Sequence, residues 1–357
     1  MWTDATGRPM NTAAAPGLHY PWEAPPALGE TTEVAAGLHW LRLPLPFRLD
    51  HINVWLLDGP EGWTAIDTGC DTTEIRAAWE GSLSGLMQGA PLEQLIATHG
   101  HVDHIGLAGW LTERFGSRYH ASFGEWLWSR LSHLRDVPGS EPTLRHFLNR
   151  HGVPGEIARS VAEGRKGFMD MATDVPGSIL ELRNASRINF GGRDWQVIVT
   201  RGHTYEHAAF WCEEDGILIA GDHLLPHISP VVAVFEMVPE ADPLGDYLAS
   251  FDQFAEIPDD ALVLPSHGRP YRGLHRRIAE LRAHHRERLD AFEVLLDREQ
   301  TSYELSRRLF AHVKGDDEMA FALGETLAHL NHLTTLGRAR RSEDAKGLAR
   351  FLATDLR

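Results

Sequence analysis

A chain of 357 residues is long enough for one large domain and a smaller one, and its hydrophobic fraction of 43% is ordinary for a globular protein. The net charge of −16, with twice as many acidic as basic residues in the first 270, argues against general nucleic-acid binding. The chain has only two cysteines, Cys70 and Cys212, which excludes a disulfide framework. No apolar run is long enough to span a bilayer, and no secretory signal pattern opens the chain, so a cytoplasmic protein is predicted.

The first 271 residues divide into an arm and a layered domain. Residues 1–30 contain five prolines and no sustained hydrophobic period, which predicts an extended N-terminal arm. Short apolar runs then predict strands at 38–43, 52–57, 64–66, 94–98, 195–199, 208–212, 216–220 and 261–264. Helices are expected between them at 73–79, 104–115 and 243–254. Strands interleaved with helices predict an α/β layered domain over residues 31–271.

Two further segments have a helical pattern. Residues 122–175 combine helical periodicity with many aromatic side chains and several turn signals, which predicts a helical insertion between two sheet segments. Residues 272–357 are expected to form a smaller, mostly helical domain. Its helices are predicted at 275–297, 302–310, 320–336 and 344–352.

The segment that carries the chemistry follows the predicted strand at 94–98. Residues 98–106 read Thr-His-Gly-His-Val-Asp-His-Ile-Gly, which places three imidazoles and one carboxylate within six residues. Alternate side chains of an extended chain point the same way, so His99 and His101 can face one metal ion. Asp103 and His104, at the start of the next helix, can face a second ion. A histidine-rich surface turn is the alternative, but the residue types, their order and their setting all favour a metal site.

Three more candidate ligands follow predicted strands in equivalent positions. They are His203, Asp222 and His267. The ends of several strands meet along one edge of a sheet, and functional side chains gather there. Each residue alone is an ordinary loop residue, but together with the first cluster they provide seven ligands, enough for two ions.

The pattern at residues 99–104 matches the His-x-His-x-Asp-His signature of the metallo-β-lactamase superfamily, and the chain resembles that superfamily from about residue 33 to 271. The resemblance implies an αββα sandwich with every ligand position filled. It implies a first metal held by His99, His101 and His203, a second held by Asp103, His104 and His267, and Asp222 as the bridge. It also implies supporting roles for Asp67 and His207, which would orient the ligands without binding metal.

The ligand set resembles that of glyoxalase II-like thioesterases, lactonases and nucleases more than that of β-lactamases, which often place Cys in the second site. The C-terminal segment resembles the winged-helix-like domain of a branch that includes thioesterase-like enzymes and an RNA endonuclease. Two divalent ions about 3.5–4 Å apart lower the pKa of a bridging water, so no nucleophilic side chain is needed. Asp103 is the predicted catalytic residue, because it can accept the proton of the attacking water. Zinc is the expected metal, with iron or manganese as alternatives.

Several residues are candidates for contacts outside the metal site. Tyr205, His223 and His227 are substrate-contact candidates because they lie close in sequence to predicted ligands. The aromatic side chains of the insertion could line an apolar pocket or form a small helical core, and we name Trp126, Trp128 and Phe168 for the pocket. His284 and His285, on the longest predicted helix, are expected at the surface.

The expected function is metal-dependent hydrolysis of a thioester, ester or lactone of a small molecule, and acyl-coenzyme A is one candidate. The alternative is a metal-dependent RNA phosphodiesterase that uses C-terminal arginines such as Arg338, Arg340 and Arg341. Solvated arginines paired with nearby acids are the preferred interpretation of that cluster. A metal-binding sensor with little turnover is a third hypothesis. No membrane association is expected, and a homo-oligomer is compatible with the sequence.

Overall fold

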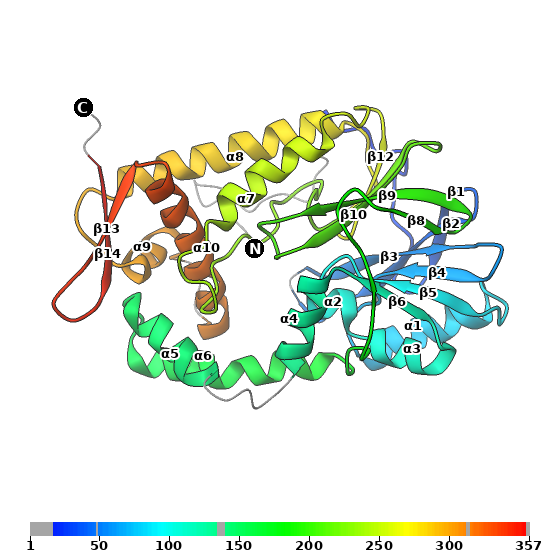
Figure 1. The fold of residues 1–357 in the computed structure, drawn as a ribbon, viewed down its shortest axis with the longest axis horizontal. Coiled ribbons are helices and arrows are strands. Elements are labelled where there is room, and N and C mark those ends of the chain that lie inside the picture. The colour runs from blue at the N-terminus through cyan, green and yellow to red at the C-terminus, as the bar shows by residue number, and fades with distance from the viewer. Residues whose placement is uncertain (1–16, 48, 134–139, 312–314, 355–357) are drawn as a thin grey trace.

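The computed structural model describes residues 17–47, 49–133, 140–311 and 315–354 (Figure 1). The expected arm lies partly outside this range, since residues 1–16 are not described. Residues 17–30 contain no helix or extended strand, but Leu18 is buried and His19 pairs with Arg272. Among the described residues, no helix combines the length and hydrophobicity that crossing a bilayer requires.

The first sheet contains seven strands in sequence order. They are β1 (Thr31–Ala35), β2 (Leu38–Pro44), β3 (His51–Leu57), β4 (Trp63–Ile66), β5 (Leu92–Ile96), β6 (Arg118–Ala121) and β7 (Leu180–Glu181). Strands β1 to β4 pair antiparallel, whereas β4 to β7 pair parallel. The parallel half places the end of β5, and therefore the histidine-rich segment, at one edge of the sheet.

The second sheet has the order β12-β11-β10-β9-β8. Its strands are β8 (Arg187–Phe190), β9 (Arg193–Thr200), β10 (His207–Cys212), β11 (Ile217–Gly221) and β12 (Leu262–Pro265). All pairs are antiparallel except β11 with β12, which run parallel. The chain turns at the ends of β9, β11 and β12 therefore deliver three candidate ligands to the same edge.

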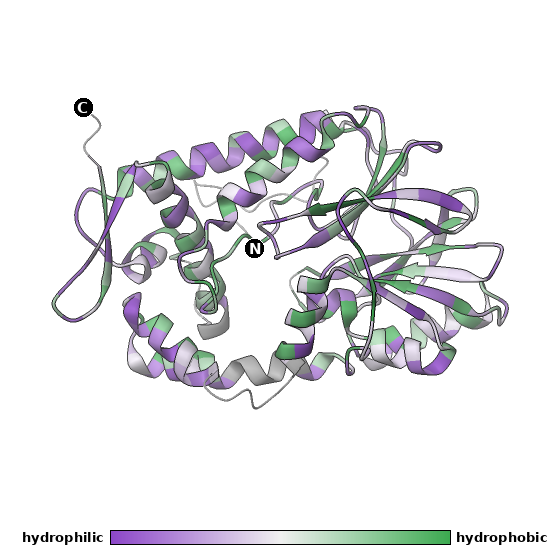
Figure 2. Ribbon diagram, in the orientation of Figure 1, coloured by the Kyte–Doolittle hydropathy of each residue, from purple (hydrophilic) through white to green (hydrophobic). Residues whose placement is uncertain are grey.

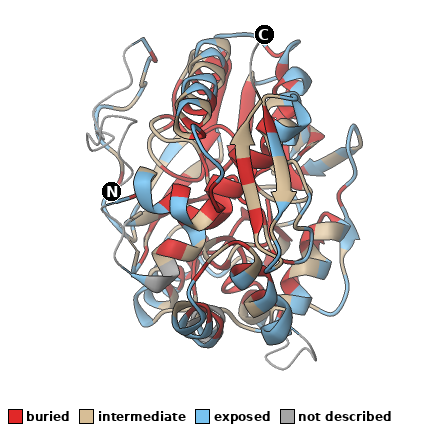
Figure 3. Cartoon of the chain, turned by 90° about the vertical axis from the view of Figure 1, so that its left-hand side faces the viewer, coloured by how far each residue is buried: buried red, intermediate tan, exposed pale blue. Residues whose placement is uncertain are grey.

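The two sheets pack face to face around an aromatic core. Trp40 and Trp55 from the first sheet and Phe190, Trp195 and Phe210 from the second are all buried. Phe190 and Trp195 stack with ring centroids 4.8 Å apart. Figure 2 shows hydrophobic stretches on the strands of both sheets, and Figure 3 shows buried residues in the interior with exposed residues along outer helices. Burial of this apolar area is the main stabilising term of such a layer.

Helices cover the outer faces of both sheets, which confirms the predicted αββα sandwich (Figure 1). On the first sheet lie α1 (Thr73–Ser84), α2 (Val102–Ile105) and α3 (Ala108–Phe115). On the second lie α7 (Pro243–Ser250), the short 3₁₀ helix η2 (Phe251–Phe254) and α8 (Leu274–Leu295). All eight strands expected from the sequence are present within about two residues at each end.

The insertion forms α4 (Phe123–His133), α5 (Ser140–Arg150), α6 (Gly155–Phe168) and η1 (Met169–Met171). Helix α4 stays beside the sandwich, whereas α5 and α6 extend away from it and α6 packs against α10 (Asp316–Thr335) of the C-terminal region (Figure 1). Phe147 of α5, Tyr247 of α7 and Leu327 of α10 belong to one continuous apolar core. The insertion and the C-terminal region are therefore packed as one body with the second sheet.

The C-terminal region contains α8, α9 (Ser302–Leu309), α10 and a hairpin of β13 (Ala339–Glu343) and β14 (Ala349–Ala353). The helix predicted at 344–352 is wrong, because this segment forms the turn and second strand of the hairpin. The Asp344 carboxylate accepts the backbone N–H groups of Lys346 and Leu348, and Gly347 has φ of +77°. A side chain that bonds its own backbone in this way favours a turn over a helix.

Candidate metal centre

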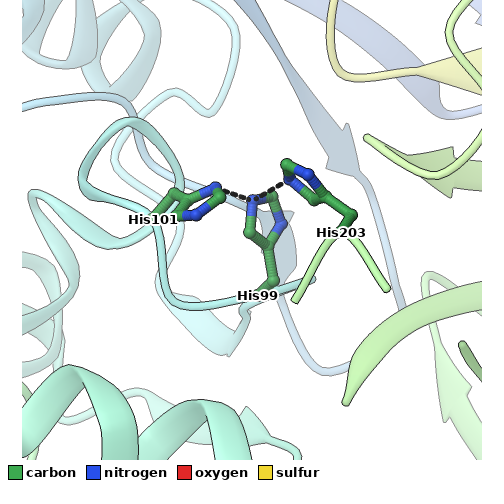
Figure 4. Close-up of side chains that lie close together, drawn as sticks. All are labelled: His99, His101 and His203. Atoms are coloured by element: carbon green, nitrogen blue, oxygen red, sulfur yellow. Dashed lines mark hydrogen bonds between the residues drawn. The ribbon is translucent and has the colours of Figure 1, made fainter. Parts of the chain in front are cut away.

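The loop after β5 and the loop after β9 bring three imidazoles together. His99 Nε2 lies 2.9 Å from His101 Nδ1 and 3.2 Å from His203 Nε2 (Figure 4). The three rings meet at this point edge to face, with centroids 4.6–4.8 Å apart. Three converging imidazole nitrogens could hold one metal ion.

A second set of ligand atoms lies next to the first. His267 Nε2 is 3.5 Å from Asp103 Oδ2 and 3.4 Å from Asp222 Oδ1. His104 Nε2 is 3.6 Å from each of the same two carboxylates. The other oxygen of Asp222, Oδ2, is 3.5 Å from His203 Nε2. Asp222 thus has one oxygen toward each set, and all seven residues predicted from the sequence come together.

Three of the five histidines donate a hydrogen bond from Nδ1 to a neighbouring oxygen, so that Nε2 of each faces inward. His203 Nδ1 donates to the carbonyl of Val231 at 2.7 Å, and His267 Nδ1 donates to the carbonyl of His51 at 2.7 Å. His104 Nδ1 donates to Asp67 Oδ2 at 2.7 Å. In a neutral imidazole, a hydrogen bond donated from Nδ1 leaves the lone pair on Nε2, which is the form that binds a metal.

The donor set fits a pair of divalent ions. His104 Nε2 and Asp222 Oδ1 are buried and have no hydrogen-bond partner among the described residues. Buried polar atoms without partners are costly, and metal coordination is one way to satisfy them. Nitrogen and oxygen donors without thiolates suit zinc, iron or manganese.

Burial and neighbouring charges shift the pKa values of these groups in opposite directions. Burial, reinforced by the surrounding imidazoles, holds the pKa of His99 well below its ordinary value. Burial also lowers the pKa of His104, but the carboxylates of Asp67, Asp103 and Asp222 outweigh it and raise that pKa to about 10. Without metal, His104 is therefore protonated at neutral pH, and a metal ion must displace that proton to bind.

Comparison with known proteins agrees with this geometry. The profile of the metallo-beta-lactamase superfamily matches residues 48–267, more than half of the chain. The chain belongs to the metallo-beta-lactamase superfamily. A second profile, the metallo-beta-lactamase-like C-terminal domain, matches residues 289–354. The chain is therefore a metallo-hydrolase of this superfamily with the C-terminal region that some members carry.

The chain is similar over much of its length to two named proteins and to one protein of known structure. The probable metallo-hydrolase YqjP of Bacillus subtilis is 26% identical over 299 residues, covering 82% of this chain and 91% of that protein. A hydroxyacylglutathione hydrolase of Synechococcus is 26% identical over 226 residues, covering 63% of this chain and 66% of that protein. The crystal structure of a beta-lactamase domain protein from Burkholderia ambifaria is similar with a TM-score of 0.86 and 38% identity, covering 94% of this chain and 98% of that one.

Two residues that the superfamily resemblance singles out support the ligands from behind. Asp67, with φ of +64°, accepts the backbone N–H of Thr98 at 2.8 Å in addition to the His104 bond. His207 Nε2 accepts the backbone N–H of Asp222 at 3.1 Å. A strained backbone and a fully buried imidazole at such places are typical of a site held in a fixed geometry.

Two further supporting residues were not predicted from the sequence. The buried carboxylate of Glu125, on α4, accepts the backbone N–H of Gly100 at 2.9 Å and that of Glu206 at 2.8 Å. It therefore ties together the two loops that carry the first three histidines. His51 Nε2 accepts the backbone N–H of Gly268 at 2.9 Å, while its carbonyl holds His267. Neither residue lies in a motif, so only the three-dimensional contacts reveal it.

The substrate-contact candidates have different settings. Tyr205 is partly exposed and lies two residues after the candidate ligand His203. His223 is fully buried against Tyr247 and two phenylalanines, which indicates packing rather than substrate contact. His227 stacks on Tyr20 with centroids 5.5 Å apart.

The aromatic residues predicted to line a substrate pocket, and the histidines predicted at the surface, lie in different environments. Trp128 lies against His101 with ring centroids 5.8 Å apart. Trp126 instead packs against the core behind the first sheet and donates Nε1–H to the Pro176 carbonyl at 2.8 Å. The side chain of Phe168 lies outside the described residues. The expectation that His284 and His285 lie at the surface is wrong for His285, which is buried on α8 against His329 of α10, whereas His284 is half-buried.

Proposed function

We propose that the protein is a dinuclear metal-dependent hydrolase that cleaves the carbonyl of a thioester, ester or lactone. The observation that supports this most directly is the convergence of all seven ligand residues, two of whose atoms are buried without partners. Two divalent ions in this set would polarise the scissile carbonyl and supply hydroxide near neutral pH. Zinc is the proposed metal, with iron or manganese as alternatives.

The chain's own residues would orient the substrate and move one proton. Asp103 is partly exposed, and one of its oxygens lies 3.5–3.6 Å from the inward nitrogens of His104 and His267. Its other oxygen can accept the proton released when water attacks and pass it to the leaving group. Asp222, held through its backbone by His207, would keep the two ligand sets at a fixed separation.

An apolar acyl group suits the wall of the site. Trp128 of α4 lies beside the first ligand set, with its ring centroid 5.8 Å from that of His101. An apolar side chain beside polar catalytic groups is typical of a small-molecule site. The hydroxyacylglutathione hydrolase relative also supports thioester chemistry, and acyl-coenzyme A remains one candidate within this class.

The RNA phosphodiesterase alternative has less support because its arginines are paired. Arg338 bonds Glu293 and Asp290, Arg340 lies 3.4 Å from Glu299, and Arg341 bonds Glu240 at 2.6 Å. Paired guanidinium groups contribute less to binding phosphate than free ones do.

The test is a hydrolysis screen of the zinc-reconstituted protein on thioesters, esters, lactones and single-stranded RNA. We expect turnover of at least one carbonyl class, and loss of that turnover in Asp103→Asn. Cleavage of RNA alone, falling steeply with salt, would instead place the protein in the nuclease class.

A further inference from the structure

The segment between β11 and α7, residues 222–242, links the metal centre to the C-terminal region. It has no helix or strand of its own between Asp222 and Pro243. Its Val231 carbonyl is the acceptor that orients His203, one of the three histidines of the first ligand set. Whatever fixes the position of Val231 therefore fixes the inward nitrogen of His203.

On one side of Val231, the segment is held by α8. Arg277 donates to the carbonyls of Leu225 and Ile228, at 2.6 Å and 3.0 Å. His285 Nε2 and Ser229 Oγ lie 2.9 Å apart, two residues before Val231. Arg277 and His285 are both buried, so these bonds are protected from water and are stronger than exposed ones.

On the other side, the segment is held by α10. The Val234 backbone N–H donates to the Gly324 carbonyl at 3.1 Å. Asn331 Nδ2 donates to the carbonyls of Pro239 and Ala241, at 3.2 Å and 2.8 Å. Gly324 leaves room for this approach, since a Cβ added there would lie 3.0 Å from the Ala233 side chain.

We propose that the C-terminal region is a positioning element of the metal centre: α8 and α10 hold residues 222–242 so that Val231 orients His203. Asn331, Gly324 and the Ser229–His285 pair are positioning residues in this scheme. The proposal rests on the two-metal site of the proposed function, and it gives the C-terminal region a role that requires neither nucleic acid nor a partner protein.

The test compares Asn331→Leu with Thr326→Val in the full-length protein. Thr326 is buried on the same helix, but among the described residues its hydroxyl bonds only the Ala322 carbonyl within α10, so it controls for general destabilisation. Stepwise zinc affinities are measured by competition with a chromophoric chelator. Asn331→Leu should lower the affinity for one of the two zinc ions by about 10-fold or more, as the loss of residues that orient metal ligands does in other proteins. Thr326→Val should leave both zinc affinities unchanged.

A double-mutant cycle locates the effect. In a His203→Ala background, Asn331→Leu should cause no further loss of zinc affinity, because the ligand through which it acts is absent. Three results would each overturn the proposal. They are an equal loss of affinity for both zinc ions, a loss no larger than that caused by Thr326→Val, and a loss that persists in the His203→Ala background. If Asn331→Leu does not fold, Ser229→Ala and Gly324→Ala take its place in the same cycle. A wild-type protein that binds none of zinc, iron and manganese would refute the proposed function itself.

Discussion

The packing of Gly221 against His207 yields a prediction whose size follows from the structure. Gly221 ends β11 with φ of +54°, and a Cβ added there would lie 2.2 Å from His207 Nε2. Gly216, which directly precedes the same strand, has φ of +62° but open space around its Cβ position. The two glycines therefore share a backbone conformation and differ in their surroundings, which makes Gly216→Ala a matched control for Gly221→Ala.

In both variants an alanine must adopt the left-handed backbone conformation, which lowers the free energy of unfolding by about 1–2 kcal/mol. In Gly221→Ala, His207 must also move away and leave the buried N–H of Asp222 without its acceptor. An unsatisfied buried donor costs about 1–3 kcal/mol. The free energy of unfolding of Gly221→Ala should therefore fall below that of Gly216→Ala by at least that second amount.

The assay is urea unfolding of the metal-free proteins, followed by zinc titration of the folded variants. Gly221→Ala should also bind zinc more weakly, because Asp222 shifts with its backbone, whereas Gly216→Ala should match the wild type. Equal unfolding free energies and equal zinc affinities in the two variants would show that His207 does not hold the Asp222 backbone.

Three further predictions concern the site and its alternatives. Asp222→Ala should reduce hydrolysis by orders of magnitude because it removes the oxygens that face both ligand sets, whereas His284→Ala, on α8, should have little effect; equal losses would refute the site assignment. The pKa of His104 is raised to about 10 in the folded metal-free protein, whereas its pKa in the unfolded chain is about 6.5. Protonation of His104 therefore stabilises the folded state fully below pH 6.5, and this contribution is lost as the pH rises through 10. Zinc added at pH 8 should therefore release a proton from His104, detectable with a pH indicator, and a His104→Gln variant should release fewer protons. Finally, replacing the paired residues Arg338, Arg340 and Arg341 together with Ala should change carbonyl hydrolysis by no more than a few-fold. RNA cleavage that falls with salt and collapses in this triple variant, with no activity on any ester, would contradict the carbonyl assignment.

The strands that deliver the ligands could be predicted from their apolar runs. β11 and β12 are buried throughout and apolar on both faces, whereas β5 and β9 combine buried apolar residues with polar residues at half-buried or exposed positions. β8 was missed because it lies at the edge of its sheet and most of its residues are exposed or half-buried. β13 reads Ala-Arg-Arg-Ser-Glu and β14 reads Ala-Arg-Phe-Leu-Ala. Neither run has a strong strand preference along its whole length, so pairing between the two decides their structure.

The ligands themselves could be predicted from local sequence, but most of their support could not. His99 to His104 lie within six consecutive residues of the loop after β5 and helix α2, and their residue types indicate metal binding directly. Glu125 reaches Gly100 and Glu206 across 25 and 81 residues, and such contacts depend on how the insertion packs. The same is true of Asn331, whose contacts with residues 239 and 241 exist only because α10 folds back over the segment.

Anomalous X-ray scattering at the zinc edge, from crystals of the reconstituted protein, tests the central claim most directly. We expect two peaks about 3.5–4 Å apart, the separation of a two-metal hydrolytic site. One should be surrounded by His99, His101 and His203, and the other by Asp103, His104 and His267, with Asp222 between them. The absence of any peak at these residues, or a single ion bound elsewhere on the chain, would contradict the account.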